Sequence, residues 1–439
     1  MLTNDLKQHV GFNRGPEAAS IASTARHRAK PAIPIERSRL RAFTFDAYTQ
    51  GSNTVWRQLK FRVPDVVHFG IDTVKQLGEE AKRLGAGKVM VLCDAGVAKA
   101  GVAQQIYDVL EGAGLSYQSF EEVEPEPSIE TLNRAADIAR AGDFDVFVGL
   151  GGGSSMDMAM VVSAMMTNQG SVQNFFGVDQ IPKRGKPTIM VTTTSGTGSE
   201  VTRMAVFTDK QANLKKVVAA QNILADVAIV DPRLTLSLPQ SVTADTGIDA
   251  LIHGIEAYIA VNASPLTDDL ALKSIAQVYS NLGTAFAAPG NLQARYNMSM
   301  GSFLAGIVLN NAGAGAVHAL AYPLGAEYHL AHGKSMTVVL CETLRLESLA
   351  CMDKFANMAQ AMGVDTKDMT QWEARDAALD AIEQLMKAVR LPTTLSDIKA
   401  DKSLVPQWSV AAHGERRLLG NTPRDLTLQD VEEIFYAAF

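Results

Sequence analysis

From about residue 63, short apolar runs alternate with stretches of helical periodicity. The apolar runs are rich in branched side chains, as buried parallel strands are, and they cover Lys88–Cys93, Phe144–Leu150, Pro187–Thr192 and Val227–Val230. Helical periodicity is found near Ile71–Leu84, Gly101–Gly112 and Ile129–Ala141. Because strands that alternate with helices form a parallel sheet with helical crossovers, this part of the chain is predicted to be an α/β domain.

The hydrophobic pattern changes near residue 236. Beyond that point, apolar positions recur with a helical period in segments such as DALIHGIEAYIA, LTDDLALKSIAQVYSNL and EARDAALDAIEQLMKAV, and strand-like runs become rare. A chain of 439 residues is also longer than a single hydrophobic core usually holds. The sequence therefore predicts an α/β domain over residues 61–236 and an all-helical domain over residues 237–439.

The first 60 residues differ from the rest of the chain in charge. They carry ten Lys and Arg against four Asp and Glu, whereas the whole chain has a net charge of −7. The segment ASTARHRAKPAIPIERSRLRA is basic and has no clear periodicity, which is typical of a solvated tail. Residues 1–60 are predicted to be a basic N-terminal extension, either partly disordered or a contact arm, and a transit peptide is a further interpretation.

Composition argues against several classes of partner. The net charge of −7 and a pI near 5.7 disfavour nucleic acid as the main partner. No apolar run approaches the roughly 18 residues of a membrane span, and no secretory signal pattern follows the N-terminus. Three cysteines without paired spacing, Cys93, Cys341 and Cys351, favour a reducing compartment. We therefore predict a cytoplasmic protein with no membrane partner.

A glycine-rich turn follows the predicted strand Phe144–Leu150. It reads GGGSSMD over residues 151–157, and the helical run MDMAMVVSAMM comes next. Glycines between a strand and a helix let the backbone approach an anion, and the helix start adds unpaired N–H groups and a favourable dipole. A purely structural turn is the alternative. The predicted phosphate-binding residues are Gly151, Gly152, Gly153, Ser154 and Asp157.

A second loop of small and hydroxylated residues follows the predicted strand Pro187–Thr192. It reads TTTSGTGSEVT over residues 192–202. Open α/β sheets bind ligands at the carboxyl ends of their strands, so we expect both loops to line one cleft. The residues predicted to bind cofactor here are Thr193, Thr194, Thr197 and Thr202.

Asp94 directly follows the predicted strand Lys88–Cys93. An acidic residue at that place accepts hydrogen bonds from an adenosine ribose and repels a 2′-phosphate, which favours NAD over NADP. Capping of the next helix is the alternative role. Together with the two loops, Asp94 indicates a Rossmann-like, dinucleotide-binding domain.

One carboxylate and three imidazoles are candidates for a metal site. Asp249 and His253 are four residues apart, so on a helix their side chains share one face. His318 and His332 lie in the largely apolar segment VHALAYPLGAEYHLAHG. These four donors suit a divalent ion such as Fe(II) or Zn(II). His329 is not predicted to be a ligand, and it lies either on a pocket wall or on a helix surface.

Taken together, these motifs resemble those of the iron-containing (group III) alcohol dehydrogenase family. The resemblance covers about residues 60–439 and rests on GGGSSMD, TTSGTGSEVT, the Asp249/His253 pair, the thirteen residues between His318 and His332, and the C-terminal GNTPRDLTLQDVEEIFYAAF. It implies a dehydroquinate synthase-like fold with the site in the cleft between an NAD(P)-binding domain and a helical domain. It also implies that all four candidate residues hold the metal and that the protein is a homodimer or a higher homo-oligomer.

The resemblance assigns further residues to the site. Lys215 matches the family lysine near the nicotinamide ribose, and Tyr322 stands where many members have a histidine, so Tyr322 is a candidate proton relay. Met160 stands where the glycine-rich motif usually continues to a lysine. These two departures, at Met160 and Tyr322, affect the expected cofactor contacts and the expected route of the proton.

The same correspondence predicts a mainly apolar substrate pocket lined by Met204, Leu309 and Leu418. Arg203 or Arg416 is a candidate to meet a substrate carboxylate, and a surface or structural role is the alternative for each of them.

The activity implied by the resemblance is that of a metal-dependent, NAD-linked alcohol dehydrogenase or aldehyde reductase. In such an enzyme the metal polarises the alcohol or carbonyl oxygen, and a hydride passes to or from nicotinamide C4. The expected substrate is a small primary alcohol or aldehyde, or a short hydroxy acid such as 4-hydroxybutyrate. A hydroxyacid–oxoacid transhydrogenase and a dehydroquinate synthase-like lyase are the alternatives. The four-ligand set argues against a non-catalytic binding protein, because such polar groups are unfavourable to bury without a metal.

Overall fold

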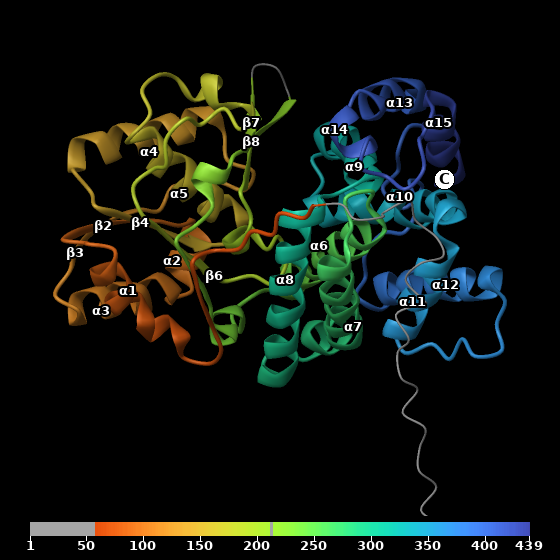
Figure 1. Cartoon of the computed structure of the whole chain (residues 1–439), viewed down its shortest axis with the longest axis horizontal. Coiled ribbons are helices and arrows are strands. Elements are labelled where there is room, and N and C mark those ends of the chain that lie inside the picture. The colour runs from red at the N-terminus through yellow and green to blue at the C-terminus, as the bar shows by residue number, and fades with distance from the viewer. Residues whose placement is uncertain (1–57, 211–213) are drawn as a thin grey trace, which may run out of the picture. The chain divides into compact units, whose positions relative to one another are not determined.

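A six-stranded parallel sheet occupies the first part of the chain and helices occupy the second, in the computed structural model of the protein (Figure 1). The structure describes residues 58–210 and 214–439, so all but the last three residues of the predicted N-terminal extension lie outside the described residues. The strand order is β1–β9–β6–β4–β2–β3, and all neighbouring strands are parallel. The bounds are β1 Val66–Phe69, β2 Lys88–Leu92, β3 Ser116–Phe120, β4 Val146–Gly151, β6 Thr188–Thr192 and β9 Val227–Val230.

Helices cover both faces of the sheet because its central strands are apolar on both sides. In β2, Val89 and Val91 pack with α1 (Leu77–Arg83) and α3 (Val102–Gly112). The alternate side chains of the same strand, Met90 and Leu92, pack with α4 (Ile129–Gly142) and α5 (Gly153–Met165). The short helix α2 (Ala95–Lys99) links β2 to α3. The predicted α/β fold class with a parallel sheet is confirmed.

The sequence predicted the four central strands but neither edge strand. β3 reads SYQSF and alternates exposed with half-buried positions, so it has no continuous apolar run. A small second sheet, with the order β5–β8–β7, was not predicted either. Its strands are β5 Gly177–Val178, β7 Met204–Asp209 and β8 Leu214–Ala219, and β7 and β8 pair antiparallel.

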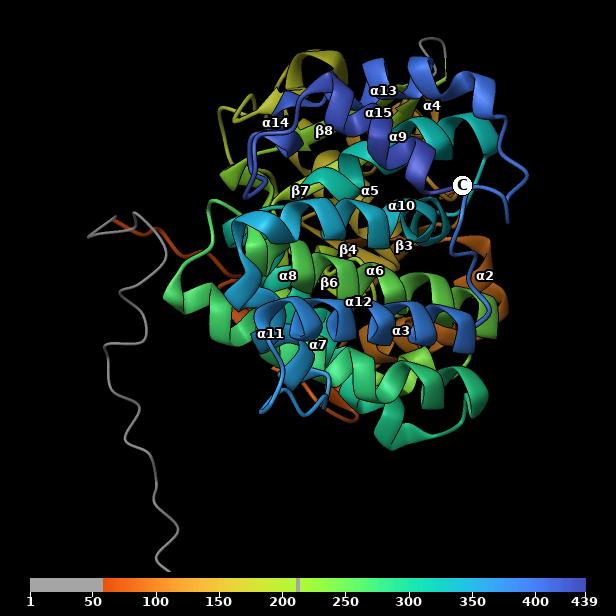
Figure 2. The same ribbon diagram turned by 90° about the vertical axis from the view of Figure 1, so that its right-hand side faces the viewer.

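The helical part begins with α6, which is buried from Gly247 to Ile259. Figure 2 faces this side of the molecule, with α11 and α12 towards the viewer. Boxes formed by Ser264, Thr370 and Thr427 with the third residue of each helix cap α7, α12 and α15. The helices are α6 Gln240–Ile259, α7 Pro265–Ala287, α8 Leu292–Ala312, α9 Ala316–Tyr328, α10 His332–Glu347, α11 Met352–Ala361, α12 Gln371–Ala388, α13 Val405–His413, α14 Arg416–Leu419 and α15 Leu428–Ala437.

No single helix among residues 58–210 and 214–439 is long and apolar enough to cross a membrane. The bent pair α8 and α9, which meet at 105°, passes the same test of length and composition only when both helices are taken together.

Candidate active site

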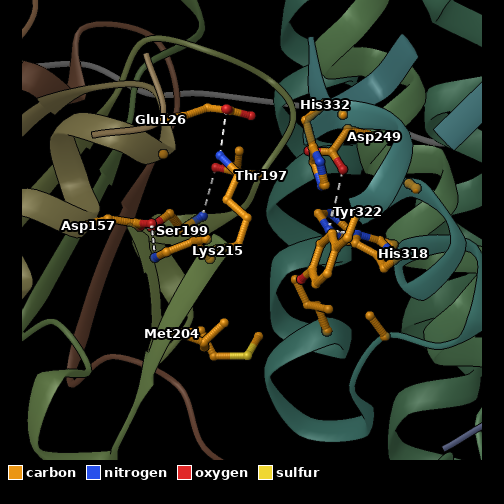
Figure 3. Close-up of a pocket in the computed structure, with 18 of the residues that line it drawn as sticks. Glu126, Asp157, Thr197, Ser199, Met204, Lys215, Asp249, His318, Tyr322 and His332 are labelled. Atoms are coloured by element: carbon orange, nitrogen blue, oxygen red, sulfur yellow. Dashed lines mark hydrogen bonds and ion pairs between the residues drawn. The ribbon is translucent and has the colours of Figure 1, made fainter. Parts of the chain in front are cut away.

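A cavity of about 220 Å³ lies between the two parts of the fold. Its walls come from the β4–α5 turn, the loop after β6 and strands β7 and β8 on one side, and from α6, α8, α9, α10 and α14 on the other. Figure 3 shows the two groups of side chains facing each other across it. The predicted site residues that line the cavity are Gly153, Ser154, Asp157, Thr197, Thr202, Lys215, Asp249, His253, His318, Tyr322 and His332.

The glycine-rich turn and the threonine-rich loop leave the sheet side by side. Gly151 of β4 pairs with Thr192 of β6, so both loops begin at the same edge. Gly151 has a φ of +145°, and a Cβ there would lie 2.6 Å from Ser155 Oγ, so only glycine fits this turn. No side chain among the described residues caps the N-terminus of α5. The first N–H groups of α5 are therefore open to an anion.

Five residues predicted to bind the cofactor do not line the cavity: Asp94, Gly151, Gly152, Thr193 and Thr194. Asp94 Oδ1 accepts hydrogen bonds from the backbone N–H groups of Gly96 at 2.7 Å and Val97 at 3.0 Å, so it caps α2 as in the alternative interpretation. Its other oxygen, Oδ2, faces Gly151. The backbone N–H of Thr193 donates to the Gly151 carbonyl at 2.9 Å and ties the two loops together.

Asp157 connects the start of α5 to the neighbouring loop and strand. Its Oδ1 accepts a hydrogen bond from the Ser199 hydroxyl at 2.6 Å, and its Oδ2 accepts one from the Val206 N–H at 2.8 Å. Burial raises the pKa of this carboxyl to about 7 against the effect of those hydrogen bonds. Asp157 thus joins α5 to the loop after β6 and to β7 in the cavity wall. Its contact with the cofactor stays a prediction.

Lys215 lies on β8 and lines the cavity from the α/β part of the fold. Its Nζ lies 2.5 Å from Glu126 Oε2 and donates a hydrogen bond to Thr208 Oγ1 at 3.1 Å. Glu126 also lines the cavity. This ion pair holds the lysine at the cavity wall, and its contact with the nicotinamide ribose stays a prediction.

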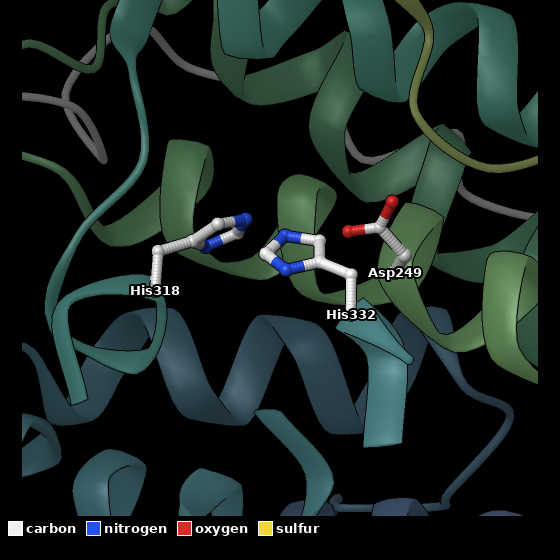
Figure 4. A group of neighbouring side chains, drawn as sticks. All are labelled: Asp249, His318 and His332. Carbon is white, nitrogen blue, oxygen red and sulfur yellow. The ribbon is translucent and has the colours of Figure 1, made fainter. Parts of the chain in front are cut away.

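The four predicted metal ligands come together. One ligand atom from each of Asp249, His318 and His332 lies within 4.8 Å of the other two (Figure 4). The ring of His253 stacks on that of His318, and their Nε2 atoms are 3.1 Å apart. His253 Nε2 is also 3.4 Å from Asp249 Oδ1. The helical spacing of Asp249 and His253 on α6 therefore aims both side chains at the two histidines from α9 and α10.

A contact between α6 and α10 positions His332. Asp245, one turn before Asp249 on α6, accepts a hydrogen bond from the Lys334 N–H at 2.9 Å. A Cβ on Gly333 would lie 2.3 Å from the Asp245 carbonyl oxygen, so only glycine allows this approach. Because α10 starts at His332, this contact fixes the ring next to Asp249.

Electrostatics leaves two of the imidazoles neutral. Burial lowers the pKa of His253 to about 3 and that of His332 to about 4. Burial raises the pKa of Asp249, whereas His332 and His318 lower it. Neutral imidazoles have a free lone pair at physiological pH, which is the form that binds a metal.

Glu256 orients His318 from behind. It lies on α6, three residues after His253, and is 1% exposed. Its Oε2 is in a very short contact with His318 Nδ1, and its Oε1 accepts a hydrogen bond from the Val317 N–H at 2.7 Å. Burial alone would lower the pKa of His318, but the Glu256 carboxylate raises it. Nδ1 therefore carries the proton, and Nε2 presents its lone pair to the cluster.

Both parts of the chain match models of one protein family. Residues 64–232 match the model described as iron-containing alcohol dehydrogenase, and residues 243–439 match the C-terminal model of the Fe-containing alcohol dehydrogenase family. The chain belongs to the iron-containing alcohol dehydrogenase family. It is therefore an oxidoreductase of the alcohol dehydrogenase type, as the sequence predicted.

Relatives in this family resemble the chain over most of its length. Long-chain-alcohol dehydrogenase 1 of Geobacillus thermodenitrificans (strain NG80-2) is 39% identical over 379 residues, which is 86% of this chain and 95% of the relative. The crystal structure of a 1,3-propanediol oxidoreductase superimposes with a TM-score of 0.85 at 33% identity, over 87% of this chain and 100% of the other. The sulfoacetaldehyde reductase of Bifidobacterium kashiwanohense, solved with NAD⁺, gives a TM-score of 0.79 at 25% identity, over 87% and 99%.

Tyr322 and the apolar pocket residues lie where the iron-containing dehydrogenase pattern predicted them. Tyr322 lines the cavity, and burial raises its pKa to about 12. Met204, Leu309 and Leu418 form apolar wall. Met160, by contrast, is buried in the core of the α/β part and does not line the cavity.

For His329, Arg203 and Arg416 the structure agrees with the surface or structural alternative that the sequence left open. His329 is exposed, ends α9 with a φ of 50°, and does not line the cavity, which is the helix-surface alternative. The Nη1 atom of Arg203 lies 3.8 Å from Asp179 Oδ1. Neither Arg203 nor Arg416 lines the cavity. The arginine on the wall is Arg417.

Sequence reasoning missed three residues of the site. Glu256 continues the helical spacing of Asp249 and His253 by one turn, so the pattern HGIEAY held a signal for it. Glu126 and Arg417 carry no local signal, because their places on the wall depend on tertiary packing.

Proposed function

We propose that this chain is a metal-dependent, NAD-linked dehydrogenase that interconverts a small primary alcohol, or a short hydroxy acid, and its aldehyde. The observation that supports the proposal is the presence in one cavity of a buried Asp–His cluster and the glycine-rich start of α5. A substrate held between them has its oxygen near the cluster and its carbon near a cofactor bound at the loops.

The proposed metal ligands are Asp249, His253, His318 and His332, and the metal is Fe(II) or Zn(II). Asp249 Oδ1 is buried and has no hydrogen-bond partner among the described residues, which is unfavourable unless a cation is bound there. The Nε2 atoms of His253 and His318 are close together, and a cation bound between them would likewise be favourable. One oxygen and three nitrogen donors suit either ion. When bound, the ion polarises the alcohol or carbonyl oxygen, and the nicotinamide accepts or donates the hydride.

The proposed cofactor is NAD. The open N–H groups at the start of α5 bind the pyrophosphate, and Asp94 Oδ2, next to Gly151, accepts hydrogen bonds from the adenosine ribose and disfavours NADP. Lys215 contacts the nicotinamide ribose. The relative that was solved with NAD⁺ supports NAD as the cofactor. The other residues proposed to form the cofactor site are Gly152, Gly153, Ser154, Asp157, Thr193, Thr194, Thr197 and Thr202.

The remaining residues hold the proton and exclude water. With a pKa near 12, Tyr322 keeps its phenolic proton at neutral pH, so it serves as a hydroxyl link that accepts and donates a proton together. Met204, Leu309 and Leu418 keep that part of the cavity apolar. Glu256 acts through His318 as a positioning residue.

The test is anaerobic purification of the full chain with metal analysis. NAD reduction by C2–C6 alcohols, diols and 4-hydroxybutyrate is then measured on the Fe(II)- and Zn(II)-loaded protein. We expect one metal per chain and NADH formation that depends on it. His318→Ala should lose both, and the exposed His329→Ala is the matched control that keeps both. Bound metal without NADH from any substrate would contradict the dehydrogenase and favour the transhydrogenase or lyase. Absence of metal binding would refute the ligand set.

Three further predictions from the sequence remain predictions. They are an NAD-binding domain over residues 61–236 with a metal-binding domain over residues 237–439, a homodimer or higher homo-oligomer, and a cytoplasmic location. Limited proteolysis tests the domain boundary, light scattering tests the oligomeric state, and cell fractionation tests the location.

A further inference from the structure

Arg417 places an unpaired cation on the wall of the cavity. It lies on α14, next to Leu418, and both residues line the cavity from the helical side. Among residues 58–210 and 214–439, no hydrogen bond or ion pair engages its guanidinium. Lys215, a second cation on the wall, is already paired with Glu126. Within the described part of the chain, all five N–H donors of Arg417 therefore stay available to a ligand.

The charge of Arg417 acts at the catalytic side of the cavity. It lowers the pKa of Tyr322 against the larger effect of burial, and it also lowers that of His318. Glu415 acts on Tyr322 in the opposite sense, but it does not line the cavity and forms no ion pair with Arg417 within the described part of the chain. Arg417 lines the same cavity as the proposed metal ligands, from the helical part of the fold, and the start of α5 lines it from the α/β part.

We propose that Arg417 binds a carboxylate or sulfonate at the far end of a short aldehyde or primary alcohol substrate. The inference rests on the proposed function, because it places the reacting oxygen of that substrate at the Asp–His cluster. The planar guanidinium matches both oxygens of a carboxylate at once. The apolar side chains of Met204, Leu309 and Leu418 suit the methylene groups between the two polar ends.

The apolar side chains that line the cavity together with Arg417 are the physical reason for the expected selectivity for anions. Apolar walls lower the local dielectric, so an anion gains more from the guanidinium there than it would in water. Arg417 is itself exposed, which reduces this gain by screening. A neutral alcohol leaves the guanidinium to solvent, and a cationic substrate is repelled. The substrate class favoured is therefore a short ω-hydroxy acid or hydroxyalkyl sulfonate and the corresponding aldehyde.

The test compares matched substrates on the metal-loaded full chain with NAD. For each variant we would measure kcat/KM for 4-hydroxybutyrate, for 2-hydroxyethanesulfonate and for 1-butanol. The wild-type chain should prefer one of the anions to butanol by roughly tenfold or more, and the two anions separate carboxylate from sulfonate. Arg417→Leu should lower that preference roughly tenfold to hundredfold, mainly through KM, and Arg417→Lys should restore part of it. Arg416→Leu is the matched control, because Arg416 does not line the cavity.

Binding provides a second readout that needs no turnover. Calorimetric titration of 4-hydroxybutyrate and 2-hydroxyethanesulfonate into the Zn(II)-loaded chain with NADH should show the same weakening in Arg417→Leu. Equal preference for butanol in the wild-type chain, or an unchanged preference in Arg417→Leu, overturns the inference and leaves the dehydrogenase proposal intact. A raised KM for NAD alone would mean that Arg417 contacts the cofactor, which also overturns it. If no substrate yields NADH, the calorimetric comparison alone decides the role of Arg417.

Discussion

Glu256 supplies two acceptors that a glutamine cannot both replace. Its Oε1 accepts the Val317 N–H at 2.7 Å, and its Oε2 contacts His318 Nδ1. In Glu256→Gln only one oxygen remains. If that oxygen keeps the Val317 N–H, the amide NH₂ faces Nδ1 and forces the proton of His318 onto Nε2, away from the tautomer that binds metal. If it turns to His318, the buried Val317 N–H loses its partner.

The size of the effect follows from these two outcomes. Loss of a partner that orients a metal-binding histidine typically weakens metal affinity by about 10- to 100-fold, or roughly 1.4 to 2.8 kcal/mol. An unpaired buried N–H costs about 1 to 3 kcal/mol, so either arrangement falls in the same range. We therefore expect the dissociation constant of Zn(II) to rise about 10- to 100-fold in Glu256→Gln.

The assay is competition for Zn(II) with a chromophoric chelator at pH 7.5, on the full chain. Glu347→Gln is the matched control: Glu347 is a buried glutamate of α10 whose pKa is raised well above its usual value, mainly by burial, so glutamine resembles its protonated form. That control should leave the Zn(II) affinity within about twofold. Glu256→Gln with wild-type affinity, in a protein of wild-type thermal stability, would refute the role of Glu256 in orienting His318.

Two further predictions concern proton transfer and stability. Because the pKa of Tyr322 is raised to about 12, Tyr322→Phe should lower kcat about tenfold or more without changing the shape of the pH profile between pH 6 and 10. Undiminished turnover at every pH would eliminate the relay. Glu200 does not line the cavity, and burial raises its pKa from 4.5 to about 7. Its protonated form therefore contributes fully to the free energy of unfolding below about pH 4.5, and this contribution is lost as the pH rises through 7. Glu200→Gln should match the wild type near pH 4.5 and exceed it by up to about 3 kcal/mol at pH 8 in urea unfolding. A constant difference across this range would contradict that assignment.

The central strands could be predicted from sequence because both of their faces are buried. β4, β6 and β9 are buried at every position, and each has an apolar run of at least three residues or of apolar residues and glycine. The edge strand β3 shares hydrogen bonds with one neighbour only and exposes every other side chain, so its sequence differs little from that of a loop. The part of the fold that was missed is therefore the part in which tertiary pairing, and not side-chain burial, determines the strand.

The geometry of the candidate metal site was predictable to different degrees. Asp249 and His253 are one helical turn apart, and that spacing alone puts them on one face of α6. The approach of His318 to His332 depends on the chain reversal at His329, whose left-handed conformation ends α9, and on the contact of Gly333 with Asp245. No periodicity encodes such a long-range contact. The family motif supplied it, and the geometry then explains why the spacing works.

The choice between Arg416 and Arg417 marks the limit of prediction from sequence. Successive residues of a helix differ by about 100° in direction, so of two adjacent arginines only one can face a given cavity. α14 has four residues and no hydrophobic period long enough to define its inner face. Its direction is set by the burial of Leu418 and Leu419 against α9 and its neighbours. That packing leaves Arg417 on the cavity wall and Arg416 off it. The proposed anion selectivity thus depends on a one-residue difference that tertiary packing determines.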